Sequence, residues 1–381
     1  MLTQTQAALV LNGLANIGPV ATQKLRRAFD GDLCAALNAN LKTLIDSGIK
    51  NQLADHIAHW QNYFDLKKEE EKIAALNAHF IAFEDVRYPQ TLRERPEIAP
   101  IGFYLRGNVH ALETVDKHSI AFIGTRKSTL YGNNQATHFA EELAARGWTI
   151  VSGLAEGIDA AAHRGALNAN GTTIAVLGTG IDIYYPAKNR ALFEQIIESD
   201  GAIISEFSIG RKADKLTFPQ RNRIVAAISQ GTFVVESDIK GGSMITANFA
   251  LNYNKPIFAL PGRIDVPASA GCHQLIRDGA ILVTRPEDII HELDGFGATG
   301  TLCFDFAEKT EMLVSKKAEK AAAISADAGT VFKLLSDGEK LTIDELIDKS
   351  QLPMPNIMAA TMLLELEQLI IKYADGRYEI N

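Results

Sequence analysis

The chain has 381 residues, of which 46% are hydrophobic and 22% are charged, and its formal net charge is −8. This length suggests two or three domains, and the negative charge excludes a general polycation, so any nucleic-acid site must be a local patch. No run of about 18 apolar residues exists, so no membrane-spanning helix is expected. The three cysteines are scattered and the N-terminus does not resemble a signal peptide, which predicts a cytoplasmic protein without a metal site.

Residues 1–75 have the pattern of a small helical domain. Gly18 followed by Pro19 predicts a tight turn with proline near the start of the next helix. This turn resembles a helix-hairpin-helix motif, in which backbone amides meet a DNA phosphate. A helical domain with an incidental Gly-Pro turn is the alternative that we favour. Residues 80–83 and 103–107 then have the pattern of short strands leading into the core.

The core, residues 119–290, alternates short apolar runs with helical stretches. The runs are bounded by glycine or polar residues and lie at 120–123, 149–151, 173–177, 232–235, 256–260 and 280–283. This alternation predicts βαβ units on a parallel sheet, an α/β fold. Ligands of such sheets bind at the carboxyl ends of the strands. Here those ends carry glycines, hydroxyls and an arginine, the residue types that hold phosphate.

Two motifs at these strand ends do not favour a dinucleotide or a metal. The first strand turns at Gly124, Thr125 and Arg126, which is not a full G-x-G-x-x-G, and no acid closes the second strand at the expected spacing. Asp159 and His163 lie four residues apart on one predicted helical face. No third ligand is apparent, so we interpret them as a helix N-terminal carboxylate and a hydrogen-bonded histidine.

The most basic part of the core lies between residues 207 and 223. Its cations and aromatic side chains are typical of a single-stranded nucleic-acid site, although a solvated basic loop is the alternative. The segment has a single acid, Asp214, and its other relevant side chains are Phe207, Arg211, Lys212, Lys215, Phe218, Arg221 and Arg223. Because an apolar helix starts near Arg221, we expect these residues along the strand-end rim. A Gly-Gly-Ser turn at 241–243 offers further N–H groups to an anion.

Residues 297–328 have the composition of a linker, and residues 329–381 have the pattern of a winged helix-turn-helix. Thr342 and Glu345 are spaced as a capping box, a third helix is expected over 357–370, and Asp375-Gly376 predicts a hairpin turn. This segment has five basic and nine acidic side chains, whereas a groove-binding module should be basic. We therefore favour a protein-contact role for it over that of a transcription regulator.

Taken together, these motifs resemble the DprA/Smf family of bacterial DNA-processing proteins. The matching stretches occur in the family's order at 88–89, 104–107, 123–126, 151–159, 175–178, 185–186, 218–224, 242–247, 261–262 and 271–276. Gly241 and Met244 stand in a turn whose sequence in the family is more often Ser-Gly-Ser-Leu. This departure is small and should leave the start of the helix intact.

The resemblance implies a domain order and a function. It implies an N-terminal sterile-alpha-motif-like domain (1–75), an extended Rossmann domain (76–296), a linker (297–328) and a winged-helix-like domain (329–381). The Rossmann domain would bind single-stranded DNA without sequence preference, protect it during natural transformation, form a homodimer and load the RecA recombinase. A single-stranded DNA-binding protein is a further possible partner, and no cofactor is implied.

The resemblance also assigns residues. The Gly-Thr-Arg pocket of the family points to Gly124, Thr125 and Arg126, and basic loops add further cations. With the residues argued above, the expected DNA contacts are Gly124, Thr125, Arg126, Gly153, Lys188, Arg211, Lys212, Lys215, Phe218, Arg221, Asn222, Arg223 and Ser243. We expect Phe218 to pack rather than stack, since Pro219 follows it. The expected dimer contacts are Leu251, His273, Ile276 and Leu282.

An enzyme is the alternative, because nucleotide phosphoribohydrolases share a core of this kind. They need a catalytic glutamate after a Pro-Gly-Gly-x-Gly-Thr turn, and the turn at 241–246 lacks both that proline and that glutamate. Glu236, the carboxylate that we consider for this role, precedes the turn. No P-loop is present either, so any loading of RecA would draw its free energy from binding. We therefore expect a binding protein without catalytic residues.

Overall fold

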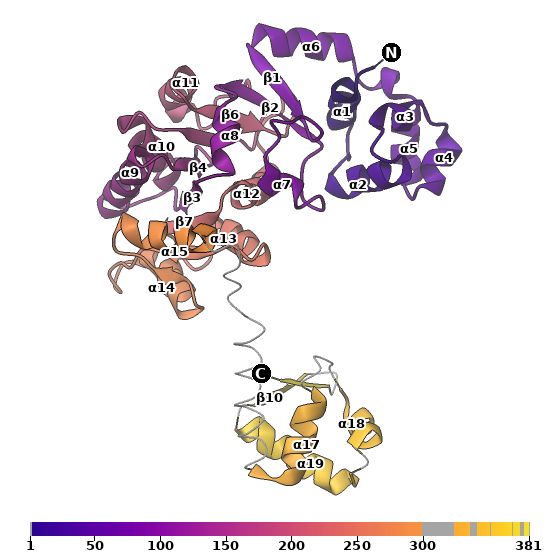
Figure 1. Ribbon diagram of the computed structural model, residues 1–381, viewed down its shortest axis with the longest axis vertical. Helices are drawn as coiled ribbons and strands as arrows, with labels where there is room; N and C mark the ends of the chain where they lie inside the picture. Colours follow the sequence, from indigo (N-terminus) through magenta and orange to yellow (C-terminus); the bar gives the residue numbers. More distant parts are fainter. Residues whose placement is uncertain are drawn as a thin grey trace. The chain divides into compact units, whose positions relative to one another are not determined.

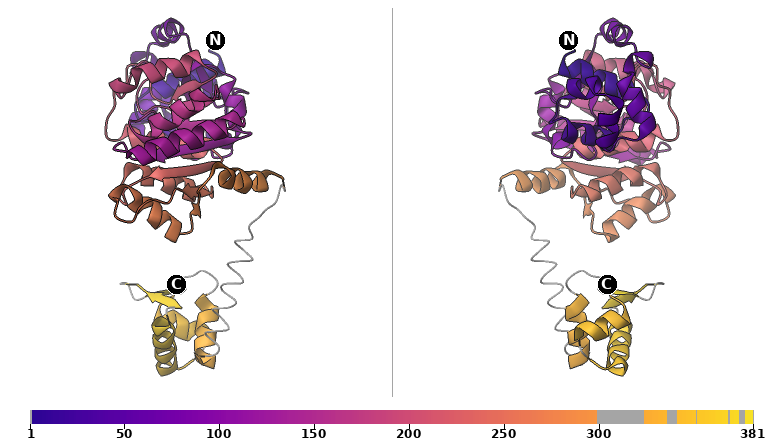
Figure 2. Two further views of the ribbon diagram at one scale, coloured as in Figure 1. Left: turned by 90° about the vertical axis from the view of Figure 1, so that its left-hand side faces the viewer. Right: turned by 90° about the vertical axis from the view of Figure 1, so that its right-hand side faces the viewer.

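The computed structural model describes residues 2–298, 324–335, 341–350, 352–367, 369–373 and 377–380 (Figure 1). The chain divides into two compact units, Met1–Leu293 and Asp294–Asn381. The first unit is built around one large sheet covered by helices, and the second is a small bundle with a hairpin (Figures 1 and 2).

The sheet of the first unit has nine strands in the order β1-β2-β6-β5-β4-β3-β7-β8-β9. All neighbours from β6 to β9 are parallel, whereas β1 and β2 add an antiparallel edge. The strands are β1 (Ala78–Ala82), β2 (Gly102–Gly107), β3 (Ser119–Gly124), β4 (Thr149–Ser152), β5 (Thr173–Val176), β6 (Ala202–Ser205), β7 (Gly231–Glu236), β8 (Ile257–Ala259) and β9 (Ile281–Leu282). The predicted α/β fold with a parallel sheet is confirmed.

Both faces of the central strands are buried, which explains their nearly continuous apolar sequences. Ile120 and Phe122 of β3 pack in one cluster with α9 (Leu130–Ala145), α10 (Ile158–Asn168) and α15 (Pro286–Ala298). Ala121 and Ile123 point to the other face, where they pack with α12 (Thr217–Ile228), α13 (Gly242–Asn252) and α14 (Ala270–Arg277). The sheet is therefore doubly wound, and the chain reverses its direction of winding beside β3.

Six helices precede the sheet. They are α1 (Gln4–Gly13), α2 (Pro19–Ala28), α3 (Leu33–Asn38), α4 (Leu41–Asp46), α5 (Asn51–Ala58) and α6 (Leu66–Ala75). As the sequence predicts, α2 starts at Pro19 directly after Gly18. These helices share one apolar cluster with β1, β2 and α11 (Arg190–Glu198), and the buried Glu69 of α6 accepts a hydrogen bond of 2.9 Å from the Tyr104 hydroxyl. Short helices α7 (Gln90–Arg93) and α8 (Ala111–Val115) complete the unit.

One strand was absent from the sequence prediction. β6 contains only three apolar residues, Ala202, Ile203 and Ile204, before the polar Ser205. A run this short gives a weak periodic signal. Its identity as a strand depends on pairing with β5 on one side and β2 on the other, and such pairing is a tertiary feature.

The second unit has its own buried core and contains α17 (Ala326–Leu335), α18 (Ile343–Ser350), α19 (Met354–Leu366), β10 (Ile370–Lys372) and β11 (Tyr378–Ile380). The predicted capping box is confirmed, because Glu345 accepts from the Thr342 N–H at 2.8 Å while the Thr342 hydroxyl accepts from the Glu345 N–H. The third helix ends at Leu366 rather than 370, since Ile370 pairs with Ile380 across the hairpin. The turn residues Asp375 and Gly376, and most of the expected linker, lie outside the described residues.

Within the described ranges, no helix is long and apolar enough to cross a membrane. Over those same ranges, no cluster of three or more histidine, cysteine or acidic side chains is arranged to hold a metal ion.

His163 of α10 is a fully buried histidine beneath the sheet. Its Nδ1 lies 2.7 Å from the Thr173 hydroxyl, which itself donates to the Ile150 carbonyl, so Nδ1 carries the proton and donates. Its Nε2 is buried without a hydrogen-bond partner. Burial, together with the positive charge of Arg221, lowers the pKa of His163 to about 3. The ring is therefore neutral in the folded protein at ordinary pH.

This histidine should make the protein acid-sensitive. Between pH 6.5 and 3 the unfolded chain binds the His163 proton while the folded chain does not, so stability falls as pH falls through that window. Replacing His163 with Asn keeps a donor toward Thr173 but removes the titration. We expect the wild type to lose about 2 kcal/mol more of its unfolding free energy than His163→Asn between pH 7 and pH 5. Urea denaturation at both pH values measures this difference, and parallel losses would contradict it.

Candidate nucleic-acid interface

A pocket of about 500 Å³ opens at the carboxyl end of the sheet, beside the point where the winding reverses. It is formed by the loops after β3, β4 and β7 together with the first turns of α12 and α13. The side chains and backbone that line it include Gly124, Thr125, Arg126, Gly153, Ala155, Asp159, Lys215, Phe218, Arg221, Asn222, Asp238, Gly242 and Ser243. Nine of the thirteen expected DNA contacts thus meet in one pocket.

The loop between β4 and α10 is held rigidly at the edge of this pocket. The Asp159 carboxylate accepts from the N–H groups of Gly153 (3.1 Å) and Ala155 (3.4 Å). Burial raises the pKa of Asp159, which the charge of Arg221 opposes. The Asn189 amide donates to the carbonyls of Leu154 and Ala155. These contacts hold the buried Leu154 at φ 54°, a strained conformation for a leucine.

Arg221 forms the floor of the pocket. It is 5% exposed, and its Nη1 donates to the carbonyl of Gly153, at the end of β4, and to that of Val176, at the end of β5. Its Nε donates to Asn222 at 3.0 Å. Position 153 must be glycine, because a Cβ there would lie 2.2 Å from Nη1. Burial lowers the pKa of Arg221 to about 10, so the guanidinium remains charged at neutral pH.

Arg126 is the exposed cation at the mouth. Its guanidinium carbon lies 5.0 Å from the centre of the Phe218 ring, a cation–π distance. On the other side, Phe218 packs against Tyr185 with ring centres 5.5 Å apart, and Tyr185 is 40% exposed. Phe218 also lies beneath Gly178, while one part of its ring faces the pocket. A second hollow of about 60 Å³ lies between Phe218 and Tyr185.

The remaining charges of the pocket nearly balance. Lys215 is exposed at its rim, and with Arg126 and Arg221 it faces two acids, Asp159 and Asp238. Ser243, in the first turn of α13, is buried, and its hydroxyl lies 2.7 Å from that of Ser237. The first turn of α13 directs backbone N–H groups that have no partner within the helix toward the pocket side. The site is suited to a single phosphate group rather than to a dense array of them.

Four expected contacts do not line this pocket. Lys188 is exposed and pairs with Glu156 at 3.2 Å, at the edge of the smaller hollow. Arg211 pairs with Asp214, and Lys212 is exposed beside it. These three belong to the surrounding surface. Arg223 is different, because it points into the protein.

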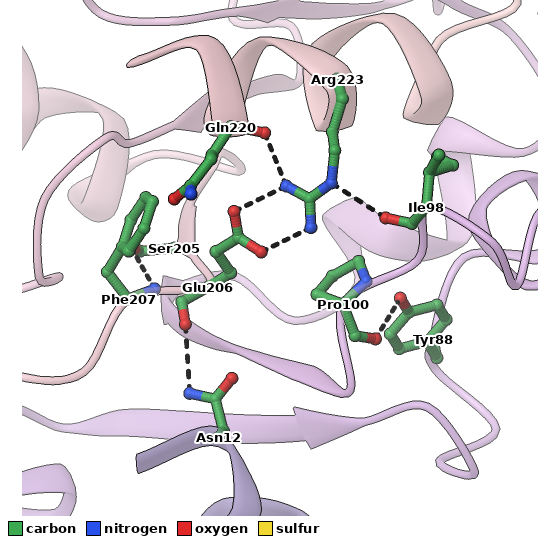
Figure 3. A network of polar contacts seen from close by, with 9 residues as sticks. All are labelled: Asn12, Tyr88, Ile98, Pro100, Ser205, Glu206, Phe207, Gln220 and Arg223. Atoms are coloured by element: carbon green, nitrogen blue, oxygen red, sulfur yellow. Dashed lines mark hydrogen bonds and ion pairs between the residues drawn. The ribbon is translucent and has the colours of Figure 1, made fainter. Parts of the chain in front are cut away.

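Arg223 is held by a buried network on the opposite side of α12 (Figure 3). Its two terminal nitrogens each donate at 2.6 Å to the Glu206 carboxylate, and its Nε donates to the Ile98 carbonyl at 3.0 Å. It also donates to the Gln220 carbonyl. Burial opposes its charge, but Glu206 outweighs burial and the pKa of Arg223 is raised. Its donors are engaged, so we leave Arg223 out of the proposed interface.

Three of the expected dimer residues lie on α14 and on β9, the edge strand of the sheet, whereas Leu251 lies on α13. Leu251 and Leu282 are 63% and 49% exposed. Ile276 is half-buried against the core, and the His273 Nε2 lies 2.9 Å from the Gly262 carbonyl oxygen. The two leucines are therefore the accessible members of this set.

Glu236, the candidate acid of the enzyme alternative, has a structural position. It is buried, and its two oxygens accept from the backbone N–H and the hydroxyl of Thr129 at the start of α9. Gly132 packs against it so closely that a Cβ would lie 2.2 Å from Oε2. Its carboxylate caps a helix and does not line the pocket.

Sequence reasoning missed two residues of the site. Tyr185 was noted only as part of a Tyr-Pro motif, although it packs on Phe218. Asp238 was not considered, although it lines the pocket. Its position two residues after a strand was the available signal, because parallel strands end at a common edge.

The fold and the pocket define a Rossmann-type α/β protein with an open polar-edged pocket, containing an exposed arginine and helix N-termini, at its strand ends. Residues 79–294 match the family model described as DNA recombination-mediator protein A, and residues 315–376 match the DprA winged helix domain. The chain therefore belongs to the DNA recombination-mediator protein A (DprA) family, and the resemblance drawn from the sequence motifs is confirmed.

Individual relatives support the same family assignment. Protein Smf of Synechocystis sp. is 36% identical over 286 residues, covering 75% of this chain and 71% of the relative. Protein Smf of Escherichia coli K12 is 42% identical over 217 residues, which are 57% of either chain. The X-ray structure of DNA processing protein A from Streptococcus pneumoniae has 31% identity and a TM-score of 0.66, covering 77% of this chain and 99% of that one.

The Glu206–Arg223 pair gives a stability prediction. Replacing Glu206 with Ala leaves a buried guanidinium without its counterion, so we expect a loss of about 3–5 kcal/mol. Replacing both residues with Met removes both charges and should cost less than Glu206→Ala alone. Chemical denaturation of the single and double variants measures the difference. If the loss of unfolding free energy in the double Met variant equals the sum of the losses in Glu206→Met and Arg223→Met, the pair is not coupled.

Proposed function

We propose that the strand-end pocket binds the backbone of single-stranded DNA without sequence preference, and that the protein mediates recombination through this binding. The observation that carries the proposal is Arg126, an exposed guanidinium at the mouth of a pocket where glycines, hydroxyls and helix N-termini converge. These groups suit a phosphate, because backbone N–H groups and arginine both donate to its oxygens.

The aromatic side chains support a single strand over a duplex. Tyr185, which is 40% exposed, lies beside the pocket and packs on Phe218, and a base can stack on such a ring only when it is unpaired. The contacts involve the sugar-phosphate chain and the flat faces of bases, which carry no sequence information. Lys215, and beyond the pocket Lys188, Arg211 and Lys212, extend the cationic path along which the strand runs.

We further propose that the protein acts as a homodimer that protects incoming single strands and loads RecA on them. The exposed Leu282 lies on β9, the open edge of the sheet, and the exposed Leu251 lies on α13. An unpaired edge and exposed apolar side chains both favour association. Two linked pockets raise the affinity for one strand through effective concentration. That avidity compensates for the few cations in each pocket.

Removing the Arg126 side chain tests the site. We expect Arg126→Ala to weaken single-strand binding for every sequence alike, and to lower the slope of log K against log salt by about 0.7, the value for one lost phosphate contact. Arg27→Ala is the matched control, because Arg27 is an exposed arginine of α2 and its loss changes the net charge equally. Fluorescence anisotropy with single-stranded and duplex oligonucleotides at several salt concentrations measures both quantities.

Equal affinity for duplex DNA, or equal losses in Arg126→Ala and Arg27→Ala, would place the interface elsewhere. If no oligonucleotide binds, the result favours the enzyme alternative. It is then tested by measuring base release from nucleoside monophosphates, with the wild type and with Glu236→Gln.

The dimer proposal has its own test. Replacing both Leu251 and Leu282 with Asp places two charges at the proposed contact, so we expect a monomer in sedimentation at concentrations where the wild type is a dimer. The monomer should bind long single strands about tenfold or more weakly, and should accelerate RecA assembly less. Val86→Asp is the control, since Val86 is exposed but distant in the fold. A variant that stays dimeric, or a monomer that loads RecA fully, contradicts the proposal.

A further inference from the structure

The second unit exposes an apolar surface on its third helix, α19. Met354, Met358 and Met362 are 52%, 52% and 64% exposed, and Leu363 is 40% exposed. Their spacing of four places the methionines along one side of the helix. On the opposite side Ile357, Ala360 and Leu364 are buried in the unit's core. We call the exposed set of Met354, Met358 and Met362 the methionine face; Leu363, nine residues after Met354, lies half a turn further around the helix.

This surface is unusual for the chain and for a winged helix. It holds three of the six methionines in the protein, and residues 350–364 contain no charged side chain. A helix that enters a DNA groove needs cations to meet the phosphates. The methionine face has none, and exposed contiguous apolar side chains mark binding surfaces for proteins. Flexible thioethers are well suited to adapt to a partner's side chains.

An acidic side chain, Glu365, lies at the end of the methionine face. It follows Met358 by seven residues, which places it on the same side of α19. Among the described residues of 324–380, seven are acidic and four are basic. A binding partner should therefore combine an apolar stripe with basic flanks. An amphipathic helix that carries lysine or arginine beside its apolar residues has this chemistry.

A second copy of the unit fits less well. Parallel pairing of two α19 helices through this face would bring the two copies of Glu365 together. Antiparallel pairing would bury Glu365 against Met354, and residues 350–364 contain no cation to balance it. Duplex DNA would bring its phosphates toward Glu365.

We propose that the methionine face docks a basic amphipathic helix of another protein. The winged-helix unit would then serve as an adaptor, which a protein bound to DNA through its other unit uses to recruit a partner. This docking does not depend on the DNA pocket, because Arg126 belongs to the other unit.

The test uses the full-length chain and a fluorescein-labelled helical peptide of leucine and lysine, with leucines three and four residues apart. A peptide with glutamate in place of lysine, and one whose leucines are scrambled around the helix, are the controls. We expect the lysine peptide to bind and both control peptides to fail. Binding should weaken about tenfold or more in Met358→Lys/Met362→Lys, and should persist in Met358→Leu/Met362→Leu, which keeps the surface apolar.

Two further variants separate the methionine face from the rest of the acidic surface. Glu365→Lys should weaken binding of the lysine peptide and permit binding of the glutamate peptide. Val86→Lys, at a 93% exposed position of the first unit, should change neither. Circular dichroism of each variant checks that the helices remain folded. The Arg126→Ala variant should bind the peptide normally, which distinguishes this proposal from the DNA pocket.

Several results would overturn the proposal. They are the absence of lysine-peptide binding, equal binding of the glutamate peptide by the wild type, and peptide affinity unchanged in Met358→Lys/Met362→Lys. Self-association of the wild type that this variant abolishes would assign the face to a second copy. Duplex binding that the variant abolishes would assign it to DNA.

Discussion

The strand-end pocket depends on one buried cation. Arg221 donates to backbone carbonyls at the ends of β4 and β5, and the facing Gly153 must lack a side chain to admit it. A buried guanidinium is costly unless its donors are satisfied, so the two strand ends and Asn222 are held where those donors reach them. The Asp159 carboxylate accepts hydrogen bonds from N–H groups of the adjoining loop and so fixes that loop. It also supplies a negative charge near Arg221. A preformed site of this kind binds a flexible strand without having to order its own loops.

Arg221 and Arg223 of α12 point in opposite directions because they lie two residues apart in the helix. A helix turns about 100° per residue, so residues two apart point to nearly opposite sides. Arg221 therefore faces the pocket while Arg223 faces Glu206, and Glu206 in turn accepts from Asn12 of α1 through its backbone carbonyl. α12 thus connects the edge of the pocket with the N-terminal helices. Because both side chains are rigidly held, the exposed Arg126 and Lys215 are the cations free to follow a ligand at the pocket mouth.

The sequence predicts the sheet well and the individual roles of its cations poorly. Strand positions follow from apolar runs bounded by glycine, and strand ends of a parallel sheet must share an edge, so Gly124, Gly153 and Ser243 could be grouped in advance. β6 was missed because its run is short, and the role of Arg223 was misjudged because local charge counts do not reveal a buried carboxylate from another strand end. Long-range pairing decides both, and a single sequence does not display it.

The charge of the second unit does not by itself identify what the unit binds. An excess of acids argues against DNA but does not say what binds instead. The positive evidence is the distribution of exposure along α19, in which burial of Ile357, Ala360 and Leu364 forces Met354, Met358 and Met362 outward. Helical periodicity would permit a charged outer side, as on most surface helices. Here the outer side is apolar, which costs solubility unless a partner covers it. The proposed docking of a basic amphipathic helix would cover this surface.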